Sequence, residues 1–389
     1  MADGGQESLA AFRDEIADWI DRNAPADVRG RDFDESDICW GGRNFVFKSE
    51  GQKLWMDRCS ARGLTAPRWD TAYGGAGFTR AQEKVWLEEL ARLRVKKPLE
   101  SFGLWMLGPA LLAFGTEEQK RHYLPQITRG EIRWCQGYSE PGAGSDLASV
   151  QTFGADKGDH WLVNGQKIWT SYADKADWIF ALVRTDREAA KHKGISFLLV
   201  DMTTPGISTR PIRLISGKSP FCETFFDDVV IPKDQIVGEV NRGWDVAKHL
   251  LTHEREMIGG GGSGAIGARS IGSVLADGDI TDPHTVARAQ KLEIDSLAFG
   301  LTMERYRDLA KQGGVGHASA MLKYYGTELN KDRYELLMTA GGSDALAWDG
   351  KYGALAPEWL RTKANSIEGG TSEVMLDILS KRVLELPGE

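Results

Sequence analysis

The sequence predicts an α+β protein in which a helical segment, a strand-rich segment and a second helical segment follow one another. The chain has 389 residues, enough for two or three domains of ordinary size. Apolar residues recur with a helical period up to about residue 133 and again beyond residue 240, whereas short β-rich runs lie between. Such segregation favours an α+β architecture over a doubly wound sheet. We therefore expect domains at 1–133, 134–240 and 241–389.

The first segment is expected to be helical. A helix capped by Ser8 should end before Pro25, because its apolar residues share one stripe and proline follows it. A second amphipathic helix is expected over 81–94. The uncharged segment 102–114 is typical of a buried helix.

The middle segment is expected to form an antiparallel sheet. Its strand-like runs are 161–163, 178–183, 195–200 and 224–231. Asn164-Gly165 lies between two such runs and is a strong hairpin signal. Helical periodicity then returns from about Trp244, and the later helical stretches are 285–311, 318–340 and 372–384.

Composition and charge exclude several classes of protein. The net charge of −8 argues against a nucleic-acid partner, which requires a basic surface. The four cysteines are scattered without a Cys-x-x-Cys pair, so neither disulfides nor a zinc site is indicated. The first residues include Asp3 and Glu7 and form no apolar core segment, so no secretory signal is expected, and no apolar run is long enough to span a bilayer. We expect a cytoplasmic protein without metal or membrane insertion, whose 45 Gly and 13 Trp need an explanation.

Two short motifs are better explained without special chemistry. Residues 262–267 match Gly-x-Gly-x-x-Gly, but the dinucleotide fingerprint needs a preceding strand, and a helical pattern precedes this one. A glycine-lined helix that admits another backbone or a flat ligand is the alternative. His249 and His253 are spaced like zinc ligands on a helix, yet no third ligand accompanies them.

Three other segments suit a cofactor. Residues 137–146 combine glycines with hydroxyls, which fits a phosphate or a polar ring edge, or equally a tight turn. In 164–171, Trp169 could form the wall of a planar cofactor site or belong to a sheet core. Residues 367–373 predict a loop that turns into a helix, with Thr371 or Ser372 as cap, and such a helix start suits a phosphate or a ring carbonyl.

These three segments, in this order and spacing, resemble the acyl-CoA dehydrogenase family over essentially the whole chain. The resemblance implies an N-terminal α-helical domain, a central antiparallel β domain and a C-terminal four-helix-bundle domain that enclose one FAD per subunit. It also implies the position of each cofactor residue. The cofactor-binding residues would be Gln136, Tyr138, Ser139, Gly144, Ser145, Trp169, Thr170, Ser171, Gly341, Gly342, Thr371 and Glu373.

The resemblance gives several of these residues a specific role. Ser139 would meet the polar edge of the flavin ring, Trp169 would pack beside the ring, and Ser171 would lie near its reactive nitrogen. Gly341-Gly342 would support the adenine of a neighbouring subunit. Ser145, Arg255 and Gly370 are assigned to the substrate.

The chain also departs from the family pattern. The usual Arg-x-x-Phe-Gly segment is absent between Gly267 and Thr285, and Met338 stands where a Gln usually precedes the glycine pair. Many members carry the catalytic base in a Tyr-Glu-Gly-Thr segment, but here Gly369 takes that position and Glu368 lies one residue earlier. Members that act on branched, long-chain or steroid side-chain thioesters place the base on the glycine-rich helix before an Arg, which Glu254-Arg255 matches. Glu254 is the expected base, Glu368 the second choice, and a site without a base the third.

The implied reaction is FAD-dependent α,β-dehydrogenation of an acyl-CoA thioester to a trans-2-enoyl-CoA, with electrons passed to an electron-transferring flavoprotein. A homodimer or homotetramer is expected, with a heteromer as the alternative. Two other functions remain open: an acyl-CoA oxidase, monooxygenase or desulfinase on the same fold, and a non-catalytic subunit of a heteromeric dehydrogenase.

Overall fold

The computed structural model describes residues 3–30, 35–259, 281–311 and 316–387. The chain forms two compact units, and each is described by itself. The first contains Met1–Pro211 with Phe221–Leu250, and the second contains Ile212–Pro220 with Leu251–Glu389. Helices before β1, strands up to β8 and helices beyond them confirm the predicted α+β class.

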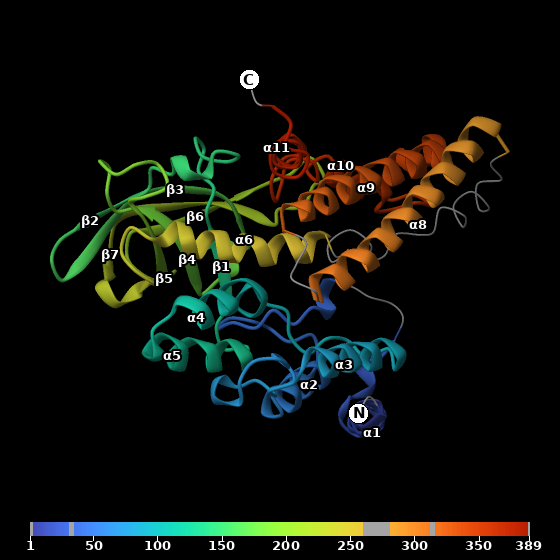
Figure 1. The fold of residues 1–389 in the computed structure, drawn as a ribbon, viewed down its shortest axis with the longest axis horizontal. Helices are drawn as coiled ribbons and strands as arrows, with labels where there is room; N and C mark the ends of the chain where they lie inside the picture. Colours follow the sequence, from blue (N-terminus) through green and yellow to red (C-terminus); the bar gives the residue numbers. More distant parts are fainter. Residues whose placement is uncertain (1–2, 31–34, 260–280, 312–315, 388–389) are drawn as a thin grey trace. The chain divides into compact units, whose positions relative to one another are not determined.

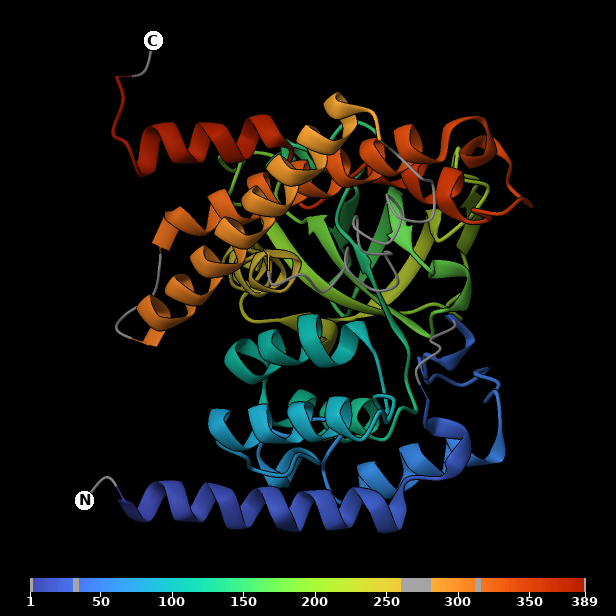
Figure 2. The same ribbon diagram turned by 90° about the vertical axis from the view of Figure 1, so that its right-hand side faces the viewer.

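The first unit joins a helical layer to a sheet. Its helices are α1 (Asp3–Asn23), α2 (Glu50–Ala61), α3 (Arg80–Arg92), α4 (Gly108–Phe114), α5 (Glu117–Thr128) and α6 (Gly243–Gly259), whose last residues belong to the second unit. Helices α1 to α5 lie together on one side of the strands in both views (Figures 1 and 2). Thr79 and Thr116 cap α3 and α5 through reciprocal bonds with the Gln three residues later, which explains where these helices begin.

Two helix predictions were wrong in detail. The first helix begins at Asp3, so Ser8 lies inside it instead of capping it. No proline precedes Ser8, and a cap-type residue alone does not prevent a helix from extending further. The expected helix over 102–114 is a π-helical turn, Gly103–Leu107, followed by α4, because Pro109 cannot donate a backbone hydrogen bond in a continuous helix.

Part of the tryptophan surplus lies in the core of the helical layer. Trp19, Trp55 and Trp86 come from α1, α2 and α3, with ring centroids 5.6, 6.3 and 6.2 Å apart. Trp55 is 1% exposed, and its Nε1 donates to the carbonyl of Lys96 at 2.9 Å. The three rings therefore pack α1, α2 and α3 against one another, a contact that the sequence analysis did not predict.

The sheet contains eight described strands. They are β1 (Trp134–Gly137), β2 (Phe153–Asp156), β3 (His160–Ser171), β4 (Trp178–Arg184), β5 (Ile195–Asp201), β6 (Ile207–Ile212), β7 (Phe221–Pro232) and β8 (Ile236–Val237). The order is β6-β7-β3-β2-β4-β5-β8, and β1 pairs with β4. The pairs β2–β3, β3–β7, β4–β5 and β5–β8 are antiparallel as predicted, whereas β1 and β2 meet β4 in parallel.

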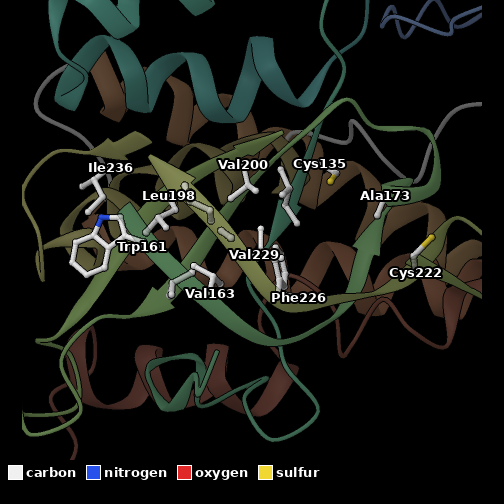
Figure 3. Close-up of a cluster of buried hydrophobic side chains, with 14 residues drawn as sticks. Cys135, Trp161, Val163, Ala173, Leu198, Val200, Cys222, Phe226, Val229 and Ile236 are labelled. Carbon is white, nitrogen blue, oxygen red and sulfur yellow. The ribbon is translucent and has the colours of Figure 1, made fainter. Parts of the chain in front are cut away.

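A buried apolar cluster forms the core of the sheet (Figure 3). It includes Trp161 and Val163 from β3, Leu198 from β5 and Val229 from β7. Phe180 and Phe197 lie on neighbouring strands outside this cluster and stack with centroids 5.8 Å apart. Strands β4 and β5 are therefore buried almost continuously, which explains their unbroken apolar sequences.

The hairpin predicted at Asn164-Gly165 was wrong. Strand β3 runs straight through both residues, and the β2–β3 turn lies earlier, where Lys157 N–H bonds to the His160 carbonyl and Gly158 has a φ of +91°. At Asn164 the ladder to β7 is irregular, and the Asn164 side chain exchanges two 2.9 Å hydrogen bonds with Asp228. The Asn-Gly pair therefore accommodates a bulge in a long strand instead of a turn.

Substitution of Gly165 with Ala is expected to destabilise the first unit by about 2–4 kcal/mol, from positive-φ strain and overpacking. Gly165 has a φ of +150°, and a Cβ would lie 2.6 Å from the Cα of Thr152. The free energy of chemical unfolding measures the effect. Gly300→Ala in α8 is the control, because its Cβ meets no described atom within 4 Å; it should stabilise by about 0.5–1 kcal/mol. A neutral G165A would contradict the steric argument.

The second unit is helical. Its described helices are α8 (Pro283–Lys311), α9 (Ser319–Gly341), α10 (Leu355–Thr362) and α11 (Ser372–Arg382). Helix α9 contacts the other three, and α8 runs beside it in both views (Figures 1 and 2). Leu336 packs with Ala289 and Leu292 of α8, while Tyr334 and Leu337 pack towards Trp359 of α10. The predicted helical C-terminal part is confirmed.

Candidate functional site

The first unit brings two of the predicted cofactor segments together. The loop that follows β1 approaches the end of β3, and the Ile168 N–H donates to the Ser139 carbonyl at 2.9 Å. This bond brings the segment after β1 beside the end of β3. We call the exposed and half-buried residues of these two segments the β1–β3 surface: Gln136, Ser139, Gly144, Ser145, Trp169 and Ser171.

A bulge in β3 exposes Trp169 on this surface. Lys167 pairs with Thr224 and Thr170 with Cys222, so β3 has one residue more than β7 between these two pairs. Trp169 has a φ of +60°, and 53% of it is exposed. A large aromatic residue rarely adopts this backbone conformation, and such strain is found mostly at functional sites. Its only aromatic neighbour among the described rings is Phe221, edge-on at 6.1 Å.

Several polar groups on the β1–β3 surface are available for a ligand. Within the described part of the chain, the side chains of Gln136, Ser139, Ser145 and Ser171 make no hydrogen bond. A Cβ added at Gly144 would meet no described atom within 4 Å, so a ligand can approach the backbone there. Hydroxyls, an amide and open backbone beside an exposed aromatic ring suit a planar ligand with polar edges.

Two predicted cofactor residues lie beneath this surface. Thr170 is fully buried, and its hydroxyl has no hydrogen-bond partner in the described residues. Tyr138 is 5% exposed, and its ring packs edge-on against Phe180 and Phe197. Because strand residues alternate between faces, the neighbours Trp169 and Ser171 face outward while Thr170 faces inward. Thr170 and Tyr138 thus support the surface from within.

The sequence analysis missed a buried ion pair directly under the surface. Lys167 is fully buried, and its Nζ donates to Glu140 Oε1 at 2.7 Å. Burial lowers the pKa of Lys167 to about 8, and Glu140 opposes this shift. Burial also acts to raise the pKa of Glu140, but Lys167 and the hydrogen bonds from Thr152 and Gln151 outweigh it, so this pKa lies below its usual value. The available signal in the sequence was a single charged residue, Lys167, inside the strand-forming segment that became β3.

The second unit contains another group of predicted residues. Thr371 caps α11, with its Oγ1 accepting the Val374 N–H at 3.1 Å, as predicted from the sequence. Gly370 has a φ of +97°, and a Cβ there would lie 2.5 Å from Met375 Cε. Gly341 and Gly342 end α9, and Gly342 has a φ of +54°. Glu373 is exposed in the first turn of α11.

Glu368, the second choice for the base, is held by a guanidinium. Arg361 donates from Nη1 to Oε1 at 3.1 Å and from Nη2 to Oε2 at 2.7 Å, and Asn365 also donates to Oε1 at 2.7 Å. The Asn365 carbonyl accepts a 2.8 Å bond from the buried Lys323. Both carboxylate oxygens of Glu368 are therefore engaged in holding the loop before α11.

Helix α6 contains Glu254 and Arg255, as the sequence predicted. The side chains of 252–259 and the whole of 260–280 lie outside the described residues. The predictions for the side chains of His253, Glu254 and Arg255 and for the glycine motif at 262–267 therefore concern residues outside the description. His249 is described and packs edge-on against Phe114 at 5.5 Å. No cluster of three potential metal ligands occurs among the residues that were described.

Models of one protein family match segments in both units of the chain. The acyl-CoA dehydrogenase N-terminal, middle and C-terminal domain models match residues 6–131, 135–229 and 280–384. An acyl-CoA dehydrogenase of Mycobacterium tuberculosis, IpdE1, is 37% identical over 351 residues, covering 87% of this chain and 89% of the relative. The chain belongs to the acyl-CoA dehydrogenase family. Its members are FAD-dependent oxidoreductases, so the predictions of an enzyme and of FAD are confirmed.

Other relatives agree with this acyl-CoA dehydrogenase assignment. IpdE1 of Mycolicibacterium smegmatis is 33% identical, covering 97% of this chain and 98% of the relative. A solved structure described as the Tcur3481-Tcur3483 steroid ACAD superposes with a TM-score of 0.73 at 29% identity, covering 98% of each chain. No described helix is long and apolar enough to cross a membrane. The roles of individual residues and the domain limits at 133 and 240 stay predictions.

Proposed function

We propose that this acyl-CoA dehydrogenase catalyses the α,β-dehydrogenation of an acyl-CoA thioester to a trans-2-enoyl-CoA. The observation that carries the proposal is the β1–β3 surface, where the strained, exposed Trp169 stands beside unpartnered polar groups. Strained backbone occurs mostly at functional sites, so an exposed and strained aromatic residue is well explained as the wall of a binding site. Trp169, Ser139 and Ser171 would then contact the flavin ring.

The residues present fit FAD. Ser139, Ser171 and Gln136 offer hydrogen-bonding groups that no described residue occupies, which suits the polar edge of an isoalloxazine ring. Gly144 and Ser145 provide open backbone and a hydroxyl for a diphosphate, and Ser145 would also contact the substrate. In the second unit, Gly341, Gly342, Thr371 and Glu373 are the proposed contacts to the remainder of the cofactor, with Gly370 against the substrate.

We assign the proton transfer to Glu254. Its carboxylate would remove the proton from the α-carbon of the thioester. Arg255, the next residue on α6, is proposed to contact the substrate. Glu368 is less suited, because a base needs an available oxygen and Arg361 holds both. When FAD is bound, its chemistry would provide the acceptor for the hydride that leaves the β-carbon.

The relatives support a proposal for the substrate and the partners. Because the similar Tcur3481-Tcur3483 structure is described as a steroid ACAD, a ring-bearing acyl group is our proposed substrate, with branched and long chains as the other members of the predicted class. Electrons would pass to an electron-transferring flavoprotein, and the enzyme would act in lipid catabolism in the cytoplasm. The exposed stripe of Ile294, Leu297 and Leu301 on α8 supports assembly into an oligomer, either with itself or, as in the ChsE4-ChsE5 complex of Mycobacterium tuberculosis, with a second chain.

The proposed function is tested by mixing the purified protein anaerobically with steroid-side-chain, branched and long-chain acyl-CoA thioesters. Bleaching of the flavin absorbance by one class, with 2-enoyl product and slow reoxidation in air, is the expected result. Rapid reoxidation in air would indicate an oxidase instead. A colourless protein that does not take up FAD would contradict catalysis and support a non-catalytic subunit.

A further inference from the structure

The buried Lys167 connects three separate segments of the first unit. Its Nζ donates to Glu140 Oε1 at 2.7 Å, to the Leu182 carbonyl on β4 at 2.6 Å and to the Tyr138 carbonyl at 3.2 Å. An ammonium group has three protons, so each of them has an acceptor. The side chain is fully buried, and therefore these bonds are shielded from water.

Glu140 completes the connection from the other side. Besides Lys167, its carboxylate accepts the Thr152 N–H at 2.9 Å and the Gln151 N–H at 2.5 Å, so both oxygens are used. Its backbone exchanges two 3.0 Å hydrogen bonds with Ala143, which close the turn through Gly142. One residue thus fixes the turn by its backbone and the segment before β2 by its side chain.

The pair lies immediately next to the groups that face the proposed flavin. Lys167 binds the Tyr138 carbonyl with its side chain, and the following residue, Ile168, binds the Ser139 carbonyl with its N–H at 2.9 Å. The residue after that is the strained, exposed Trp169. Lys167 and Ile168, two consecutive residues of β3, therefore fix the distance between Ser139 and the neighbouring Trp169.

We propose that the Lys167–Glu140 ion pair is a positioning pair that holds the glycine-rich turn and the Trp169 bulge as one rigid, preorganised surface for the flavin ring. This inference rests on the proposed function, because it takes the flavin as the occupant of that surface. A buried ion pair is a poor source of stability, since an apolar pair of similar size often stabilises a core as well or better. An apolar pair, however, cannot bind the carbonyls of Tyr138 and Leu182 or the N–H groups of Gln151 and Thr152.

The test uses the double variant K167M/E140Q, which removes both charges together and so avoids a lone buried charge. E89Q is the matched control, because Glu89 is also a buried carboxylate, paired with Arg13 and Arg92 in the helical layer away from this surface. Hydrogen exchange of the apoprotein, equilibrium binding of FAD and the visible circular dichroism of the bound flavin are measured for both variants. If the double variant does not fold, the single variant E140Q serves, because its amide oxygen still accepts a hydrogen bond from the Lys167 Nζ and burial already lowers the pKa of Lys167 to about 8.

The double variant should fold, yet the amides of Ile168, Ala143 and Thr152 should exchange faster than in the wild type. FAD should bind about 10–100-fold more weakly, by analogy with the loss that follows removal of the residues that orient metal ligands from behind, and the flavin dichroism should change. E89Q should leave FAD binding and the flavin dichroism unchanged, and it should not speed the exchange of these three amides more than that of other amides of the first unit. Unchanged exchange of these amides in the variant would overturn the inference without FAD being involved. A wild-type protein that does not bind FAD would overturn the proposed function and the flavin part of this inference with it.

Discussion

Replacement of Glu254 with Gln is expected to leave the fold and FAD binding unchanged while turnover of the acyl-CoA falls by about 10²–10⁴-fold. Glutamine has nearly the shape of glutamate, but its amide cannot accept the α-proton. Loss of an interaction made only in the transition state lowers kcat and kcat/KM together. Anaerobic single-turnover reduction of the flavin isolates this step from product release and from reoxidation.

The matched control is Glu368→Gln. Since Glu368 binds Arg361 and Asn365, its substitution should loosen the loop before α11 and lower thermal stability, while flavin reduction continues at a similar rate. The opposite pattern, with E368Q inactive and E254Q near native, would move the base to the C-terminal loop despite its guanidinium partner. Near-native reduction in both variants would support the third alternative, a site without either base.

The order of helices and strands was predictable because it depends on local periodicity, whereas individual turns were not. Asn164-Gly165 has the local signature of a hairpin, but β3 pairs with β2 on one side and β7 on the other, and this pairing keeps the strand straight. The turn between β2 and β3 lies instead at Gly158-Asp159, another dipeptide that is typical of a two-residue hairpin. Tertiary pairing therefore overrode the preference of a dipeptide.

The candidate site was predicted in part, through the resemblance and the glycine-rich segments. The sequence placed Trp169, Thr170 and Ser171 together, but only the register of β3 against β7 shows that Thr170 faces inward. It also could not reveal that Lys167 reaches Glu140 across 27 residues, or that Arg361 occupies both oxygens of Glu368. Ion pairs between residues far apart in the chain depend on the folded backbone, and the sequence alone does not show which residues the fold brings together.

Two tryptophans with opposite environments give the last prediction. Trp55→Ala should lower the free energy of unfolding by about 3–5 kcal/mol, the usual cost of removing a buried aromatic side chain. Trp55 is 1% exposed between two other indoles, and its loss leaves the Lys96 carbonyl without its Nε1 donor. Once folded at low temperature, W55A should still bind FAD as the wild type does, because none of these contacts belongs to the β1–β3 surface.

Trp169→Ala should show the reverse, because Trp169 is 53% exposed and contributes little to the core. Its free energy of unfolding should change by no more than about 0.5–1 kcal/mol, while FAD should bind more weakly and the spectrum of the bound flavin should change. Chemical denaturation of the apoproteins and titration with FAD separate the two effects. If W169A were as destabilised as W55A and bound FAD normally, Trp169 would be a packing residue of the sheet, the alternative that its sequence left open. The strain at its backbone would then need a structural cause, and the glycine-rich turn would lose its proposed partner at the flavin.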